Sequence, residues 1–314
     1  MTEKKTFKGI WYILKQSGSG FLEHKVLKLS AALAYYTVFS FPPLLIVVTY
    51  VCSIFFGRKA VEGAIYSQIQ SFVGSDTAVQ LQQIIKNATI SGAGNVAIVI
   101  GVVTLIIGAT SIFAEVQDSI NSIWELKAKP DLGLWPLVKD RLLSFGVIGS
   151  LGFLLLVSLG ISALVEGLSN RLQHFMPSIT VVMIYIFNLM IAFGITVALF
   201  AVIFKVLPDA EIRWNDVWAG SITTALLFIL GKFAIAFYIS KSKIGSTYGT
   251  AGALIILLVW IYYSSMILYF GAVFTKAWAV KYRKGIKPSS YAVVIEKQEI
   301  EKKDAHVSVK PAKA

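Results

Sequence analysis

LSAALAYYTVFSFPPLLIVVTYVCSIFF, residues 29–56, is the stretch that decides the fold of this chain. None of its residues is charged, and a helix that spans a bilayer needs about 20 predominantly apolar residues. Two adjacent prolines interrupt the run near its centre. Each proline removes a backbone donor and disfavours α geometry in the residue before it. The stretch therefore predicts a transmembrane helix that is broken at Pro42-Pro43.

The composition of the whole chain is that of an integral membrane protein. Of its 314 residues, 56% are hydrophobic and only 15% are charged, against about 25% charged in an average soluble domain. We therefore predict an all-α membrane protein, with a transmembrane domain at 29–280 between a basic segment at 1–28 and a charged, partly disordered tail at 281–314. Charge-poor stretches predict six transmembrane helices, at about 29–56, 95–117, 142–168, 179–206, 217–240 and 248–278.

Lysine and arginine are concentrated in every second segment between the predicted spans. They gather in residues 1–28, between the second and third spans, between the fourth and fifth spans, and after residue 275. Because cytoplasmic loops carry an excess of these residues, we expect the N-terminus and the C-terminus in the cytoplasm. The net charge of +12 then reflects this orientation and attraction to anionic lipid head groups at the cytoplasmic face. We expect no nucleic-acid partner.

The first outer loop, residues 57–94, has its own pattern. Apolar residues recur at helical spacing from Val61 to Phe72, Gly74-Ser75-Asp76 breaks the pattern, and it resumes from Val79 to Ile85. This spacing predicts a pair of short amphipathic helices on the outer face. Two roles remain open for the pair: a lid that shields the helix ends, or a gate above a cavity.

Polar groups inside the predicted spans indicate where a substrate could bind. Lys232 lies within the fifth span, where a central lysine costs about 2.5–3.5 kcal/mol on insertion scales. The proline break frees backbone carbonyls, and transporters often form their substrate sites at such broken helices. The alternatives are a plain proline kink and a lysine that reaches up to the outer interface. The predicted substrate cavity is lined by Tyr35, Tyr36, Ser40, Pro42, Pro43, Thr224 and Lys232.

A second group of polar residues is predicted at the cytoplasmic ends of the spans. The second span continues as an amphipathic helix with an acidic face, and the loop between the fourth and fifth spans carries charges of both signs. As structure, these charges are solvated or form local ion pairs; as function, Glu115 could bind a cation or a lipid head group. The predicted cytoplasmic cluster contains Glu115, Asp118, Asn121, Asp209 and Arg213.

The sequence gives little sign of catalysis. His24, His174 and His306 are scattered along the chain, and Cys52 is the only cysteine, so we expect no metal site. Nucleotide-binding and nucleophile motifs are absent. We therefore expect no cofactor and no enzymatic activity.

Four segments resemble the YihY/BrkB family of bacterial inner-membrane proteins. They are LSAALAYYTVFSFPPLL (29–45), AEVQDSINSIWEL (114–126), KVLPDAEIRWNDVWAGSITTALLFILGKFAIAFYIS (205–240) and STYGTAGALIILLVWIYYSSMILYFGAVFTKAWA (246–279). The resemblance implies a six-span protein of the bacterial inner membrane. Family members have carried the label ribonuclease BN, others are linked to serum resistance, and one relative to export of a lipid A precursor.

Together, the residues and the resemblance favour a transporter or flippase of an amphiphilic, anionic substrate such as a lipid or lipid precursor. The alternative is a non-transporting membrane scaffold or envelope-integrity factor. The nuclease label has no support in the residues, which lack the basic, aromatic-rich surface that RNA recognition uses. Membrane lipids are the expected partners, and the sequence is compatible with a homo-oligomer.

Overall fold

The structure of the protein is a computed structural model. It describes residues 7–40, 63, 79, 82–83, 94–129, 177–241, 250–282 and 285–296. Three predictions fall outside these residues: the break at Pro42-Pro43, the third span at 142–168 and, apart from isolated helical positions, the amphipathic pair at 57–94.

The described chain is mostly helical, as predicted. The helices are α1 (Phe7–Glu23), a helix at Val26–Ser40, α5 (Gly94–Trp124), α7 (Pro177–Val206), α8 (Trp214–Lys241) and α10 (Thr250–Tyr282). Helices α7 and α8 begin and end within a few residues of the predicted spans. Helices α5 and α10 begin near the predicted starts but continue past the predicted ends, to Trp124 and Tyr282. Helix α1 lies in the segment for which the sequence predicted only a basic character.

Three helices of the described chain are long and apolar enough to cross a membrane. The apolar windows are Leu189–Val206 in α7, Trp214–Ile235 in α8 and Leu254–Tyr282 in α10. This confirms a helical membrane protein.

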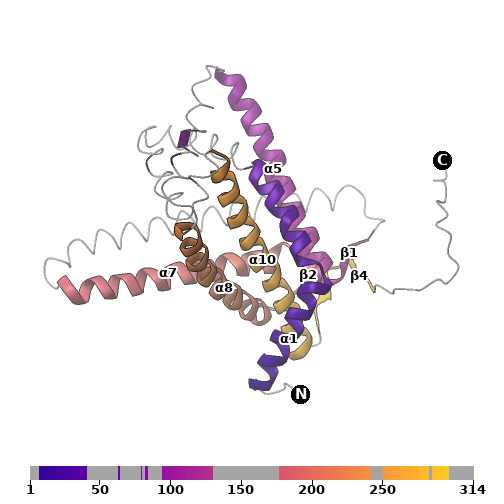
Figure 1. Ribbon diagram of the computed structural model, residues 1–314. Coiled ribbons are helices and arrows are strands. Elements are labelled where there is room, and N and C mark those ends of the chain that lie inside the picture. The colour runs from indigo at the N-terminus through magenta and orange to yellow at the C-terminus, as the bar shows by residue number, and fades with distance from the viewer. Residues whose placement is uncertain are drawn as a thin grey trace, which may run out of the picture.

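The long helices meet at one end and separate at the other (Figure 1). Helix α8 packs against both α7 and α10. The rings of Phe200 in α7 and Phe228 in α8 meet edge to face, with their centroids 5.8 Å apart. Helices α5 and α10 run in the same direction, so that the C-terminal ends of both lie at the shared end. We call this shared end the junction end.

Helices α8 and α10 cross through a reciprocal pair of glycine and threonine contacts. A methyl group added to Gly220 would overlap the Thr275 hydroxyl, and one added to Gly271 would overlap the Thr224 hydroxyl. Each threonine hydroxyl donates to the carbonyl of the glycine on its own helix, at 2.7 Å in both cases. Helices in membranes associate through small residues that allow close backbone approach, and this crossing has that form on both sides.

Two further helix contacts also use glycine. Ser40, in the apolar helix Val26–Ser40, packs directly on Gly108 of α5. Gly9 and Gly20 of α1 face Tyr282 and Val273 of α10. Helix α1 therefore runs antiparallel to the last turns of α10, beside the junction end.

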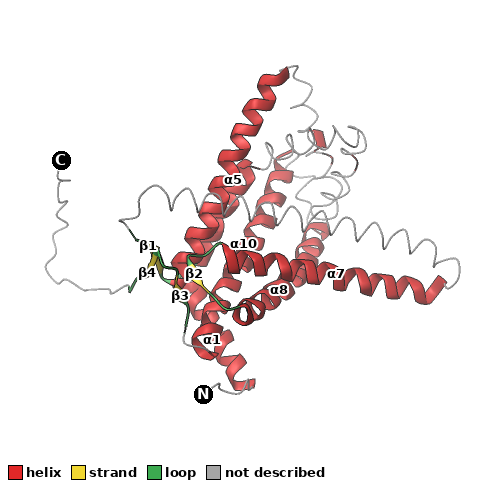
Figure 2. Cartoon of the chain, turned by 180° about the vertical axis from the view of Figure 1, so that it is seen from behind, coloured by secondary structure: helices red, strands yellow, loops and turns green. Residues whose placement is uncertain are grey.

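Two short antiparallel strand pairs lie at the junction end (Figure 2). Strand β1 (Leu126–Ala128) pairs with β4 (Ala292–Val294), and β2 (Ala210–Glu211) pairs with β3 (Lys287–Pro288). The prediction of an all-α protein is wrong in this detail. Part of the predicted tail is ordered because its backbone pairs with the segments that follow α5 and α7.

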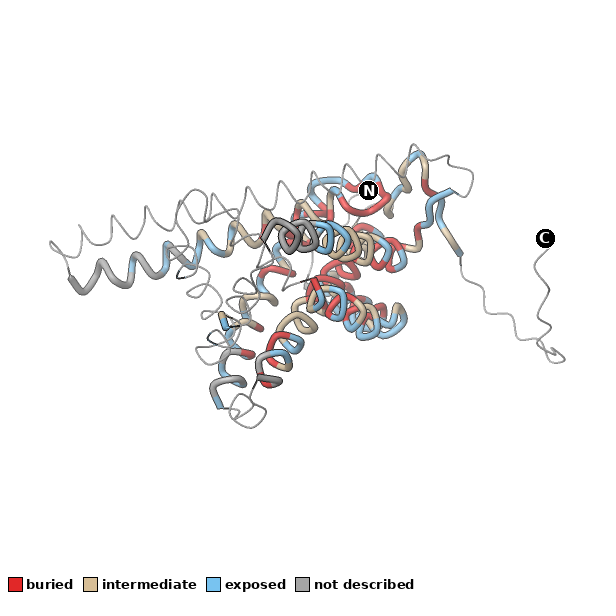
Figure 3. Tube along the Cα trace, turned by 90° about the horizontal axis from the view of Figure 1, so that it is seen from above, coloured by how far each residue is buried: buried red, intermediate tan, exposed pale blue. Residues whose placement is uncertain are grey.

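Buried residues are concentrated where the helices converge (Figure 3). One cluster of buried apolar residues joins Leu33 and Val26, Val116 and Ile120 of α5, and the inner parts of α7, α8 and α10. The core therefore lies near the junction end, and it positions the polar groups there.

The glycine contacts predict a stability difference between two matched substitutions. Gly271→Ala would place a Cβ against the Thr224 hydroxyl and 2.8 Å from the Phe204 ring, so we expect it to lower the free energy of unfolding by about 1–3 kcal/mol. Gly194→Ala in α7 meets nothing within 4 Å and should leave stability unchanged or raise it by about 0.5–1 kcal/mol. Unfolding by SDS titration, followed by circular dichroism, measures both. Equal stability of the two variants would contradict the close crossing.

Candidate functional site

A buried carboxylate lies at the centre of the junction end. Asp209 follows α7 and is only 5% exposed. Its two carboxylate oxygens accept hydrogen bonds from Gln117 Nε2 at 2.9 Å and Asn121 Nδ2 at 2.8 Å, both on α5. Its backbone amide donates to Asn121 Oδ1 at 2.9 Å. The charge is therefore held by fixed donors, as a buried carboxylate requires.

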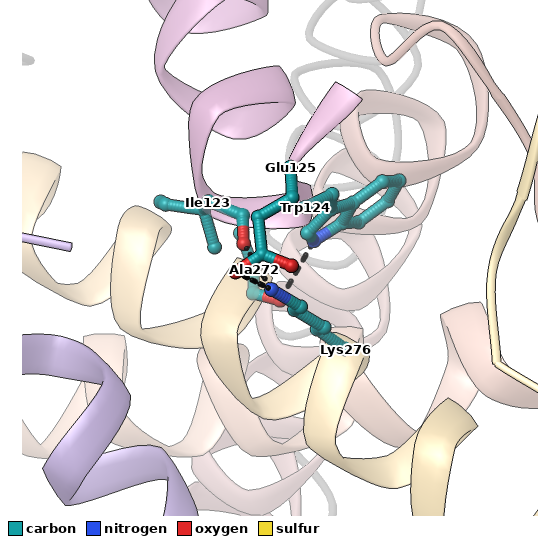
Figure 4. A network of polar contacts seen from close by, with 5 residues as sticks. All are labelled: Ile123, Trp124, Glu125, Ala272 and Lys276. Carbon is teal, nitrogen blue, oxygen red and sulfur yellow. Dashed lines mark hydrogen bonds and ion pairs between the residues drawn. The ribbon is translucent and has the colours of Figure 1, made fainter. Parts of the chain in front are cut away.

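The C-terminal end of α5 is attached to α10 by a second set of contacts (Figure 4). Trp124 Nε1 donates to the Ala272 carbonyl at 2.9 Å. Lys276 Nζ donates to the Ile123 carbonyl at 2.8 Å and pairs with the Glu125 carboxylate at 3.2 Å. The last carbonyls of a helix lack partners within the helix and attract positive charge. Lys276 provides both a hydrogen-bond donor and a positive charge at the end of α5.

The C-terminal segment forms a backbone hydrogen bond with each set of contacts. The amide of Ser289 donates to the Asp209 carbonyl at 3.0 Å, and the amide of Ile295 donates to the Glu125 carbonyl at 2.7 Å. Glu125 has a positive φ of 58°, which ends α5 and turns the chain into β1. The tail thus joins the end of α5 to the turn between α7 and α8.

The structure brings together part of the predicted cytoplasmic cluster. Asn121 and Asp209 are hydrogen-bonded, whereas the Arg213 side chain is exposed at the start of α8 and Asp118 is exposed on α5. Glu115 is half-buried and accepts a hydrogen bond from Ser119. The sequence analysis did not identify Gln117, Trp124, Lys276 or the tail strands, because none of these has a distinctive local pattern.

The described residues of the predicted substrate cavity lie in separate parts of the structure. Tyr35 and Tyr36 are exposed on the helix Val26–Ser40, and Ser40 is buried against α5, with its hydroxyl donating to the Tyr36 carbonyl at 2.8 Å. Thr224 is fully buried in the crossing of α8 and α10. Lys232 is half-buried farther along α8. Pro42 and Pro43 lie outside the described residues.

A groove of about 400 Å³ lies between α1 and the last turns of α10. Lys281 Nζ lies 5.2 Å from the centroid of the Tyr12 ring across this groove. Apolar and charged side chains alternate along its walls, among them Tyr12, Glu23, His24, Lys276, Val280 and Lys281. We call it the α1–α10 groove. Its lining suits a molecule with both a charged and an apolar part.

A smaller groove of about 300 Å³ borders Asp209 on the side of β1. Asp118, Asn121 and Lys127 also line it. Among the residues that the structure describes, no group of three His, Cys, Asp or Glu side chains could hold a metal ion.

Apolar helices that end in a polar junction define a helical membrane protein, and the sequence comparisons name its family. The chain matches the family described as virulence factor BrkB over residues 18–293. It belongs to this family, which confirms the resemblance seen in its sequence segments.

Several curated relatives are named UPF0761 membrane proteins. The chain is 29% identical to one from Methylibium petroleiphilum over 55% of its own length and 40% of the relative's. It is 25% identical to one from Ralstonia nicotianae over 83% of its length and 56% of the relative's, and 24% identical to one from Alteromonas mediterranea over 77% and 79%. The chain thus spans about half the length of several of these relatives. No solved structure matches it.

The buried Asp209 predicts that its amide donors stabilise the protein. Asn121→Ala removes two hydrogen bonds and leaves one carboxylate oxygen unpaired, so we expect the free energy of unfolding to fall by about 2–4 kcal/mol. The exposed Asn215→Ala on α8 is the matched control and should change it by less than about 0.5 kcal/mol. SDS unfolding measures stability, and limited proteolysis should cut the tail faster only in the first variant. A tail that is equally resistant in both variants would contradict the role of Asp209.

Proposed function

We propose that this protein is a transporter or flippase that moves an amphiphilic, anionic substrate, such as a lipid or lipid precursor, across the bacterial inner membrane. The α1–α10 groove is the observation that carries the proposal. Lys276 and Lys281 stand in it beside Val273 and Val280. A phosphate-bearing head group can contact the lysines while its acyl chains remain against the apolar helices.

The proposed topology has six spans, with the N-terminus and the C-terminus in the cytoplasm. Three features support this orientation: α1 packs on the end of α10, the tail pairs with the segments after α5 and α7, and α8 begins at the same end. These segments are also rich in lysine and arginine, which favours the cytoplasmic side.

Lys232 is the proposed second contact for the substrate. It lies 18 residues after Trp214, which begins α8, and this corresponds to about 27 Å along the helix axis. If the junction end is cytoplasmic, Lys232 stands in the outer half of the membrane. A half-buried cation there attracts the head group that leaves the inner groove.

The transport proposal predicts which lysines the activity needs. In liposomes that contain a fluorescent anionic lipid, the wild-type protein should expose the label to an external quencher. Lys232→Met should abolish this exchange, and Lys281→Met should slow it by about tenfold, because a charge-assisted contact contributes about 1.5–3 kcal/mol. Lys241→Met removes the same charge at the exposed end of α8 and should leave the rate unchanged.

Two outcomes of this assay would overturn parts of the proposal. Full activity of Lys232→Met would remove that residue from the mechanism. No exchange by the wild type with any anionic lipid would contradict transport and favour the membrane scaffold.

The proposed topology is tested separately with single cysteines in a Cys52→Ser background. In intact spheroplasts, a membrane-impermeant maleimide should label Lys86→Cys in the first outer loop. It should label Ser290→Cys in the tail only after the membrane is made permeable. Labelling of Ser290→Cys in intact spheroplasts would place the junction end outside the cytoplasm.

A further inference from the structure

A carboxylate and two hydroxyl groups meet where α5 packs against α10, away from both grooves. Ser119 Oγ on α5 donates to Glu115 Oε1 at 3.2 Å. Ser119 is only 2% exposed, and Glu115 is half-buried. The other polar face of α5, with Gln117 and Asn121, is fully used by Asp209. Glu115 and Ser119 are not among the hydrogen-bond partners of Asp209 or Lys276 described above.

Tyr269 of α10 completes this cluster. It is fully buried, and its hydroxyl lies beside Ser119 and within electrostatic range of the Glu115 carboxylate. Within the described chain, however, this hydroxyl makes no hydrogen bond. A buried hydroxyl without a partner costs about 1–3 kcal/mol, so its retention at this place requires an explanation.

The cluster lies deeper in the helices than the junction. Glu115 precedes Trp124 by nine residues on α5, which is about 13 Å along the axis. Tyr269 falls inside the apolar window Leu254–Tyr282 of α10. The Glu115 side chain is half-buried there, and burial of a carboxyl group disfavours its charged form.

Within the described residues, two titratable groups act on the Glu115 carboxyl group, Asp118 and Tyr269. Asp118, one turn farther along α5, is exposed and repels a second negative charge. Tyr269 is the titratable group that α10 presents. The helix Val26–Ser40 contributes apolar side chains, Val26 and Leu33, to the cluster around Val116 and Ile120.

We propose that Glu115 is a proton-binding site in which the Ser119 and Tyr269 hydroxyls hold the carboxylate after the proton has left. The neutral carboxyl group carries one proton, and release of that proton to water leaves a carboxylate that accepts hydrogen bonds from both hydroxyls. A hard cation such as Ca²⁺ takes about six to eight oxygen ligands, more than this cluster provides. The coupling of substrate movement to a proton gradient through Glu115 rests on the proposed transport function.

Carbodiimide labelling tests the proton site without any substrate. Dicyclohexylcarbodiimide is apolar and reacts with protonated carboxyl groups, and mass spectrometry of the full-length protein in liposomes locates the product. We expect Glu115 to be labelled far more than the exposed Glu23, with labelling that decreases as the pH rises. Glu115→Gln should remove the product at this position.

Two tyrosine variants separate the proposed role from general packing. Tyr269→Phe removes a donor to the carboxylate and favours the protonated form, so labelling at about pH 7.5 should rise about threefold to tenfold. Tyr263→Phe, whose hydroxyl lies 3.4 Å from the Leu227 carbonyl, is the matched control and should not change labelling. Helical circular dichroism and elution volume confirm that each variant is folded.

The outcomes distinguish this inference from the transport proposal. Labelling of Glu115 no stronger than that of Glu23, labelling independent of pH, or equal effects of the two tyrosine variants would overturn the proton site, whatever the transport assay shows. Labelling as expected in a protein that exchanges no lipid would retain the proton site and refute its coupling to transport.

Discussion

The burial of the Asp209 carboxylate is the constraint on which the rest of the structure depends. A buried charge that loses its partners is strongly destabilising, so the donors on α5 and the turn after α7 must stay together. The Asp209 carbonyl in turn fixes the tail through Ser289. Elements that are far apart in the sequence are thereby held at one level. Beyond this level the long helices diverge (Figure 1).

Helix α10 is the element through which the proposed sites are connected. Its last turns form the α1–α10 groove, Lys276 and Ala272 bind the end of α5, and Tyr269 faces Glu115. On its other side, Gly271 and Thr275 form the crossing with α8. Farther along, a Cβ on Gly231 of α8 would overlap the Tyr263 ring, next to Lys232. Close packing on glycine thus connects α10, which forms one wall of the groove, to α8, which carries Lys232.

The sequence predicted the long helices well, because an apolar run of about 20 residues has few other stable structures. It did not predict the strands, since β1 and β4 are only three residues long and pair residues that are far apart in the chain, such as Lys127 and Val293. Asn121 and Asp209 were correctly grouped by their place at the helix ends. Thr224 was placed in a cavity because a threonine that packs against glycine looks the same in sequence as one that faces a ligand. Tyr269 was missed because it lies within an apolar run, where a tyrosine beside a polar group looks the same in sequence as one that only packs in the core.

The positions of the anchors constrain how a charge on Glu115 could act on α10. Trp124–Ala272 and Lys276–Ile123 fix the register of α5 and α10 at the junction end. In the proposed mechanism, a carboxylate that gains a hydrogen bond from Tyr269 therefore draws α10 closer to α5 beyond these anchors. Because α8 is packed on Gly271 through Thr224, it would follow α10 and carry Lys232 with it. In the proposed mechanism, proton release thus moves α8, because the close glycine–threonine contacts prevent α8 and α10 from sliding past each other.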